Sequence, residues 1–241
     1  MVLQAIVAFA LAPPFLNTYT LSEMVSVFLP ILFTMFIVVD PIGLVPLYMG
    51  LTSRLLPAQK KGIIRKAVLI SFTVLVGFIF LGKSILALLH IEPGSFYIAG
   101  GIMLFIIAME MLFGKPSHSK LSEREHSESI NDEGISLAIF PLAIPMLAGP
   151  GAITAIILYT SAYSGGRWEF GFPVIAIMLI ISVVIILGIA WFVLRASDFI
   201  LRFLGETGVS VLERIMGLIL SGMSIQFVYE GIVRLGFIPG A

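Results

Sequence analysis

The sequence contains no cysteine and few charged residues. Only 12% of its 241 residues are charged, 59% are hydrophobic, and the mean hydropathy is +1.11. Soluble domains are about 25% charged and about 45–50% apolar, so a soluble core of this length could not bury so much apolar surface. The absence of cysteine excludes disulfides, cysteine-ligated zinc and iron–sulfur clusters. A net charge of zero without a long basic stretch gives no indication of nucleic-acid binding.

Long apolar stretches dominate the sequence instead. A helix needs about 20 mostly apolar residues to cross a bilayer. Six stretches meet this requirement, each with at most one charged residue: 24–50, 67–89, 94–113, 135–163, 172–194 and 215–233. The chain starts with a shorter apolar run that stops at Pro13-Pro14 and would be about 18 Å long as a helix. We expect an all-α integral membrane protein with six transmembrane helices, preceded by an interfacial or disordered leader (1–21).

The basic residues are distributed asymmetrically. Short loops rich in Lys and Arg stay in the cytoplasm, and the loops after the first, third and fifth stretches contain eleven of the fourteen Lys and Arg residues. This asymmetry predicts a multi-pass protein of the plasma (inner) membrane with both termini outside. The polar segment 114–134 is expected to be a flexible cytoplasmic linker. Tyr97, Tyr163 and Trp168 fall near predicted outer ends, where aromatic residues serve as interfacial anchors.

The two halves of the chain resemble each other. Residues 40–43 read Asp-Pro-Ile-Gly within the first apolar stretch, and residues 149–152 read Gly-Pro-Gly-Ala within the fourth. In the third and sixth stretches a glycine precedes a polar residue by nine positions, in 101–110 and in 217–226. We predict two inverted three-helix repeats, 22–113 and 135–236, each with a discontinuous first helix, as is typical of secondary transporters. The alternative is that glycine and proline are simply common in membrane helices.

The two clusters of proline and glycine predict a binding site. Proline inside a helix removes a backbone hydrogen bond. An unwound centre exposes a half-helix N-terminus, which favours a carboxylate, and a half-helix C-terminus, which favours a cation. We therefore predict substrate-binding residues at both breaks: Asp40, Pro41, Gly43, Gly149, Pro150, Gly151 and Thr154. The alternative interpretation makes both breaks structural kinks that pack against neighbouring helices.

Three polar side chains within the spans are candidates for coupling or gating: Asp40, Glu110 and Gln226. An ionised carboxylate deep in a span costs about 2.5–3.5 kcal/mol on insertion scales, so Asp40 should face the protein interior. Asp40 could bind a substrate ammonium group or a coupling ion, H⁺ or Na⁺. It could also cap a helix, because Asp directly before Pro is a good N-cap. Glu110 and Gln226 occupy equivalent positions in the two halves, and Glu110 could instead be an interfacial carboxylate.

Four segments resemble the signatures of the MarC family of six-span bacterial and archaeal membrane proteins. They are residues 39–46 (Val-Asp-Pro-Ile-Gly-Leu-Val-Pro), 96–105, 141–154 and 214–219. The resemblance covers about residues 24–236, nearly all of the predicted membrane domain. It implies a transporter of small neutral amino acids such as glycine and alanine, with uptake linked to the proton gradient. It also implies a distant relation to the LysE-type amino-acid exporters.

The breaks and the resemblance together favour a secondary transporter that works by alternating access. The alternatives are an exporter of amino acids or of another small solute, a channel, and a membrane scaffold that does not transport. No HExxH or GxSxG motif and no paired intramembrane aspartates occur, so we do not expect an enzyme. The expected partners are a small neutral amino acid, H⁺ or Na⁺, and membrane lipid. We expect no cofactor and no metal, and a homo-oligomer is compatible with the sequence.

Overall fold

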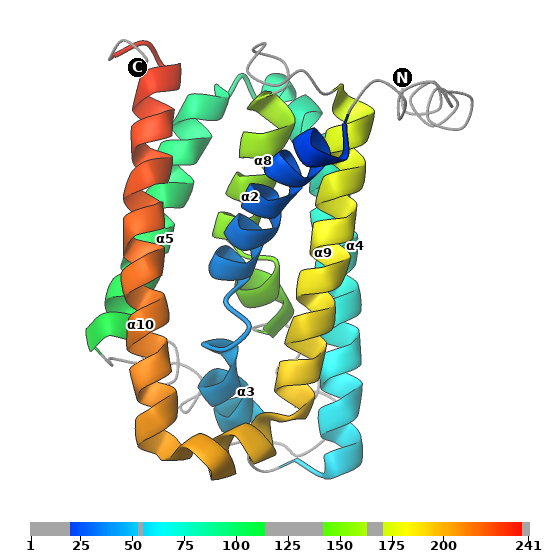
Figure 1. The fold of residues 1–241 in the computed structure, drawn as a ribbon, viewed down its shortest axis with the longest axis vertical. Coiled ribbons are helices and arrows are strands. Elements are labelled where there is room, and N and C mark those ends of the chain that lie inside the picture. The colour runs from blue at the N-terminus through cyan, green and yellow to red at the C-terminus, as the bar shows by residue number, and fades with distance from the viewer. Residues whose placement is uncertain (1–19, 53–54, 114–141, 163–170, 238–241) are drawn as a thin grey trace.

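The computed structural model describes residues 20–52, 55–113, 142–162 and 171–237. These residues form helices and no strand, as expected for an all-α membrane protein (Figure 1). The helices are α2 (Leu21–Val39), α3 (Leu44–Thr52), α4 (Pro57–Leu88), α5 (Pro93–Phe113), η2 (Leu142–Leu147), α8 (Pro150–Ala162), α9 (Phe172–Arg195) and α10 (Ser197–Arg234). Several predicted features lie outside the described residues: the linker, nearly all of the leader, and the anchors Tyr163 and Trp168.

Five helical segments of the described chain are long and apolar enough to cross a membrane. They are Leu21–Thr52, which includes a break, Gln59–Leu88, Pro93–Phe113, Phe172–Arg195 and Thr207–Arg234. The remaining predicted span, 135–163, is described only over residues 142–162. Its helix α8 has 13 residues and is about 20 Å long, which is shorter than a hydrocarbon layer of about 30 Å. The count of six spans and the inverted repeat therefore stay predictions.

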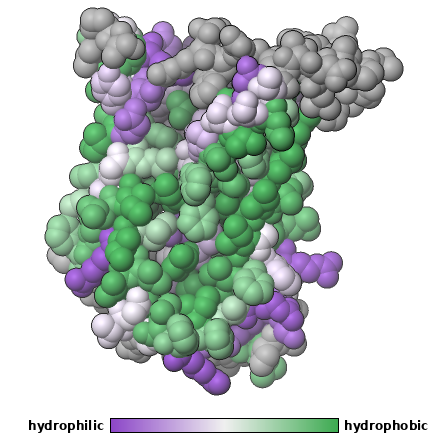
Figure 2. Space-filling model, in the orientation of Figure 1, coloured by the Kyte–Doolittle hydropathy of each residue, from purple (hydrophilic) through white to green (hydrophobic). Residues whose placement is uncertain are grey.

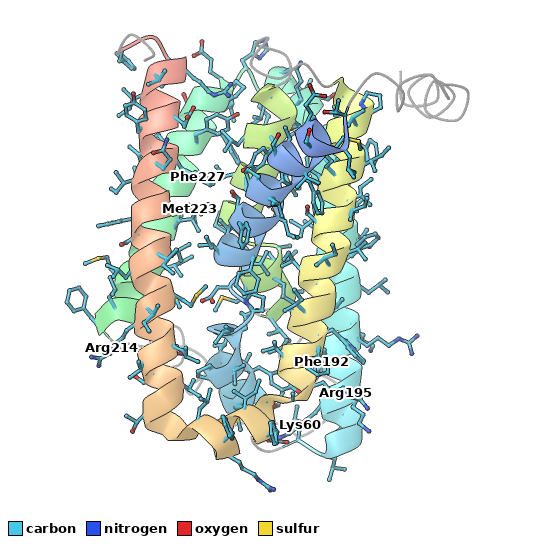
Figure 3. All side chains as sticks on the ribbon, in the orientation of Figure 1. Lys60, Phe192, Arg195, Arg214, Met223 and Phe227 are labelled. Carbon is cyan, nitrogen blue, oxygen red and sulfur yellow. The ribbon has the colours of Figure 1, made fainter. Side chains whose placement is uncertain are left out.

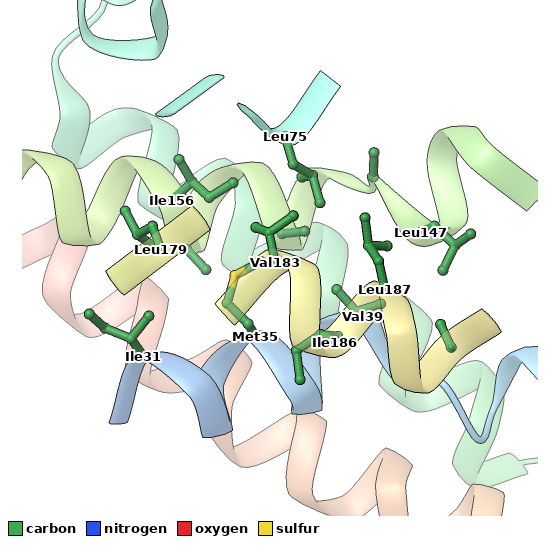
Figure 4. Close-up of a cluster of buried hydrophobic side chains, with 14 of the residues drawn as sticks. Ile31, Met35, Val39, Leu75, Leu147, Ile156, Leu179, Val183, Ile186 and Leu187 are labelled. Carbon is green, nitrogen blue, oxygen red and sulfur yellow. The ribbon is translucent and has the colours of Figure 1, made fainter. Parts of the chain in front are cut away.

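Apolar side chains cover both the inside and the outside of the helix bundle. The inner ones come from several helices and are fully buried together, as Figure 4 shows for Ile31, Met35, Ile156, Leu179 and Val183. Large apolar side chains are also exposed on the outside, and Figure 2 shows them covering the middle of one face, with hydrophilic residues nearer its two ends. Helices that are apolar on all sides are typical of membrane spans, because their outer side chains contact the apolar interior of the bilayer.

The broken helices occupy the middle of the bundle. α5 and α10 pack along each other on one side and α4 and α9 on the other, with α2, α3, η2 and α8 between them (Figure 1). α2 and α8 run in opposite directions, and the described chain begins and ends at the same end of the bundle. Lys60, Arg195 and Arg214 lie toward the opposite end (Figure 3). The predicted separation of basic residues from the termini is therefore present, while the orientation in the cell stays a prediction.

Small residues bring α5 and α10 into close contact. The contacts join one residue of each helix and recur every seven residues: Gly94 with Gly231, Gly101 with Ser224, and Ala108 with Gly217. A Cβ atom on Gly101 would lie only 2.7 Å from the carbonyl oxygen of Ser224. Membrane helices associate through such small residues, because these let the two backbones approach. The seven-residue spacing of these small residues is visible in the sequence.

The last helix changes direction at Gly205. Its backbone there has φ 66° and ψ 173°, a conformation that residues with a Cβ atom avoid. The first part of α10, residues 197–204, therefore lies at an angle to the membrane-crossing part, Thr207–Arg234 (Figure 1). Phe199 and Phe203 are exposed on this first part, with their rings stacked at 6.2 Å.

Candidate functional site

The first break separates α2 from α3 at residues 40–43. Asp40 has a left-handed backbone conformation, with φ 44° and ψ 67°, and its N–H donates to the Phe36 carbonyl at 3.0 Å. Its carboxylate turns toward the following residues and accepts a hydrogen bond at Oδ1 from the Gly43 N–H at 3.2 Å. Asp tolerates this conformation because its short side chain can bind nearby backbone donors. Asp40 therefore caps the break from both sides, since its backbone ends α2 and its side chain holds the turn that leads into α3.

The second break lies between η2 and α8. Ile144 is extended, with φ −134° and ψ 122°, and the Ala148 N–H donates to the Ala143 carbonyl at 2.9 Å across five residues. α8 then begins at Pro150, which suits a first helical position because the N–H that proline lacks has no partner there in any case. The Thr154 hydroxyl donates to the Pro150 carbonyl at 2.7 Å, so its proton is used within α8.

The two breaks lie side by side in the bundle. A Cβ atom on Gly151, directly after the second break, would lie 2.7 Å from Cγ1 of Val38, directly before the first, and would overlap Leu104 of α5. The space beside Gly151 is thus filled by the protein's own side chains, and this glycine allows α2, α5 and α8 to pack. The contact places the predicted site residues of both halves in one region: Asp40, Pro41, Gly43, Gly149, Pro150, Gly151 and Thr154.

Asp40 is the charged residue at the breaks. Its side chain is partly buried, it accepts a hydrogen bond from Gly43, and no Lys or Arg of the described chain neutralises it. Glu213 of α10 repels it electrostatically. A carboxylate within a membrane span that has no basic partner among the described residues suits a cation. Sequence reasoning missed Glu213, because it lies before the predicted start of the sixth span at residue 215.

Buried hydrogen bonds connect α8 to its neighbours. The hydroxyls of Thr34 in α2 and Tyr159 in α8 are 2.8 Å apart, and both side chains are buried. Tyr97 of α5 donates to the Ile157 carbonyl at 3.2 Å, and the Arg234 guanidinium lies 5.1 Å from the centre of its ring. Tyr97 is only 1% exposed, so the prediction of an interfacial anchor is wrong. Its ring lies between helices, where α8 accepts its proton and α10 provides the arginine.

Glu110 and Gln226 do not share one site. Glu110 follows Ala108, which contacts Gly217, and Gln226 follows Ser224, which contacts Gly101, so the two lie at different levels of the antiparallel pair α5 and α10. Glu110 is partly buried and precedes Met111, whose Cε would be 2.9 Å from a Cβ atom on Gly43. Gln226 is exposed, whereas the next residue, Phe227, is buried. Met111, the neighbour of Glu110, therefore reaches the first break from α5, and Gln226 is exposed on α10.

One segment matches the phosphate-binding P-loop by its letters alone. Residues 77–84 read Gly-Phe-Ile-Phe-Leu-Gly-Lys-Ser, which fits G-x-x-x-x-G-K-[ST]. A P-loop needs a glycine-rich loop whose backbone N–H groups surround the phosphates, followed by a helix. Here the whole segment lies inside α4, so its N–H groups point along the helix. The match therefore provides no nucleotide site.

Comparison with known proteins agrees with this architecture. The model of the family described as MarC family integral membrane protein matches residues 25–235. The chain belongs to the MarC family. A relative from Escherichia coli (strain K12), described as a UPF0056 membrane protein, is 35% identical over 206 residues, which cover 86% of this chain and 91% of the relative. UPF0056 membrane proteins from Pyrococcus abyssi and Bacillus subtilis (strain 168) are each 36% identical over 211 residues, 87% of this chain and 96% and 95% of the respective relative.

Family membership confirms the resemblance that the sequence motifs indicated. Together with the five candidate spans, it makes this MarC-family chain a multi-pass membrane protein. The names of the relatives state a membrane location and no substrate. No solved structure matches the chain.

Proposed function

We propose that this MarC-family protein is a secondary transporter of small neutral amino acids of the glycine and alanine class. In this proposal it lies in the plasma (inner) membrane and couples transport to the proton gradient. The observation that carries the proposal is the meeting of two helix breaks, from helices of opposite direction, beside a carboxylate. Paired discontinuous helices are where secondary transporters bind substrate and ion.

The two breaks offer groups of opposite charge to a zwitterion. The first amides of α8 have no partner within the helix, and the helix dipole gives this end a positive potential that suits a substrate carboxylate. Asp40 lies at the C-terminal end of α2, where the potential is negative, and suits an ammonium group or a coupling cation. In this conformation Val38 and Leu104 fill the space beside Gly151, so a substrate bound there has to displace them, which favours a small side chain.

Uptake by proteoliposomes tests the proposal. Labelled alanine and glycine are offered with an imposed pH gradient, then with the gradient collapsed, then with a sodium gradient alone. Accumulation that requires the pH gradient supports coupling to protons. Accumulation that requires the sodium gradient shows that the coupling ion is Na⁺ instead of H⁺. Gradients of both directions separate import from export.

Two variants sharpen this experiment. Asp40→Asn should abolish gradient-driven accumulation and leave exchange, because Asn keeps an oxygen acceptor for the Gly43 N–H but cannot carry the charge. Asp198→Asn is the matched control, since Asp198 is exposed on the first part of α10, and its transport should be unchanged. If neither alanine nor glycine enters or exchanges through folded, inserted protein, the proposed substrate class is wrong. That result would favour another solute or a scaffold role.

A further inference from the structure

The half-helices on the two sides of the breaks are held in different ways. On the side where the described chain begins and ends, α2 and α8, here called the upper half-helices, bond to each other through Thr34 and Tyr159. On the other side, the lower half-helices α3 and η2 both bond to α4. The Tyr48 hydroxyl of α3 donates to the Lys60 carbonyl at 3.4 Å, and the Ser71 hydroxyl of α4 donates to the Ala143 carbonyl at 3.2 Å.

One face of α8 is turned toward α2 along the upper half-helices. Gly151 contacts Val38, and Tyr159 bonds to Thr34. Residues four apart lie on the same face of a helix, so Ala155 lies between these two contacts on the face toward α2. Ala155 is fully buried, in the same core as Ile31 and Met35 (Figure 4). The upper half-helices are therefore closed against each other from the breaks up to the Thr34–Tyr159 bond.

We propose that α2 and α8 form a gate on the upper side of the breaks, and that the Thr34–Tyr159 hydrogen bond is its latch. This inference rests on the proposed transport function, because alternating access requires one side of the breaks to open while the other stays closed. The unwound segments provide hinges, since the Gly43 N–H bonds to the Asp40 side chain instead of a helical carbonyl and Ile144 is extended. Shared bonding to α4 keeps the lower half-helices together while the upper ones separate. One hydrogen bond between neutral hydroxyls is weak enough to break in each cycle.

A single cysteine between the upper half-helices reports on the gate. The chain has no cysteine, so Ala155→Cys creates the one thiol, and it is buried while the gate is closed. The measured quantity is the rate at which a small methanethiosulfonate reagent labels this thiol in reconstituted protein. Thr34→Val and Tyr159→Phe each remove the latch and keep the shape of the side chain. Each should raise the labelling rate roughly three-fold to twenty-fold, the range that corresponds to one hydrogen bond between membrane helices.

Matched controls separate the latch from general loosening. Thr73→Val removes a hydroxyl that bonds to Leu69 of its own helix on the exposed side of α4, and Tyr229→Phe removes one from a 41% exposed ring on α10. Each control variant, combined with Ala155→Cys, should be labelled at the same rate as Ala155→Cys alone. The double variant Thr34→Val/Tyr159→Phe should label no faster than the faster single variant, because both changes remove the same bond.

Two results would overturn the gate. One is an unchanged labelling rate in Tyr159→Phe, which removes a single oxygen and decides the question if Thr34→Val does not fold. The other is an equal increase in the two control variants. Labelling needs no substrate, so it is independent of uptake: amino-acid transport without a latch effect would refute the gate alone. A latch effect without transport of alanine or glycine would support the gate and refute the proposed substrates.

Discussion

A single methyl group at Gly101 should destabilise the helix bundle. Gly101→Ala would place a Cβ atom 2.7 Å from the carbonyl oxygen of Ser224 and 2.8 Å from Cγ2 of Val228. Ordinary contacts of a Cβ atom begin at 3.4 Å, so α5 and α10 would have to separate locally by roughly 0.7 Å. The carbonyl oxygen belongs to the backbone of α10 and cannot rotate away as a flexible side chain would.

The size of the effect follows from two opposing contributions. Overpacking of this kind costs about 1–3 kcal/mol. Alanine is the better helix former by about 1 kcal/mol, which offsets part of the cost. We expect a net loss of up to about 2 kcal/mol in the free energy of unfolding for Gly101→Ala. Adding Val228→Ala should recover only part of it, because the Ser224 carbonyl remains in place.

Unfolding in mixed micelles, followed by circular dichroism during titration with a denaturing detergent, measures this difference. Gly222→Ala is the matched control, because it lies on α10 and no atom lies within 4 Å of the added Cβ. It should be neutral or stabilising by up to about 1 kcal/mol, the helix-propensity gain alone. If Gly101→Ala and Gly222→Ala are equally stable, α5 and α10 do not approach each other as closely as the structure has them.

Three further predictions concern the first break, the bend in α10 and the P-loop letters. Asp40→Leu should lower the free energy of unfolding by about 2–4 kcal/mol, because Leu disfavours a left-handed backbone and leaves the Gly43 N–H without its acceptor. Asp40→Asn should lower it much less. Equal losses of stability in the two variants would contradict the capping role of Asp40. Gly205→Ala should lower the free energy of unfolding by about 1–2 kcal/mol, although the space around Gly205 is open. Gly62 is equally open but lies within a regular helix, so Gly62→Ala should not lower the free energy of unfolding. The same unfolding assay compares the two variants. Magnesium ATP should not raise the melting temperature of the unmodified protein or of the Lys83→Ala variant. A rise that Lys83→Ala abolishes would contradict the conclusion that residues 77–84 are part of a helix and bind no nucleotide.

The sequence alone determined the class of the protein and the places where its helices break. The lengths of the apolar stretches predicted five spans that the structure contains, because a bilayer requires a fixed length of apolar helix. Asp40–Gly43 and Gly149–Gly151 marked the two breaks, because proline and glycine act on the backbone where they stand. The four MarC-like segments identified the family, because each is a contiguous run of residues that can be recognised without the structure.

Only the tertiary structure decided which side chains meet at the breaks. The Thr34–Tyr159 bond joins residues 125 positions apart, and Glu213 acts on Asp40 from the last helix. No local pattern contains such pairs. In a soluble helix the alternation of apolar and polar residues reveals the buried face, but here lipid and protein interior are both apolar and that signal is weak. This is why Tyr97 was expected at the membrane surface and lies buried between helices instead. It is also why the sequence did not predict the packing of Gly151 against Val38 and Leu104.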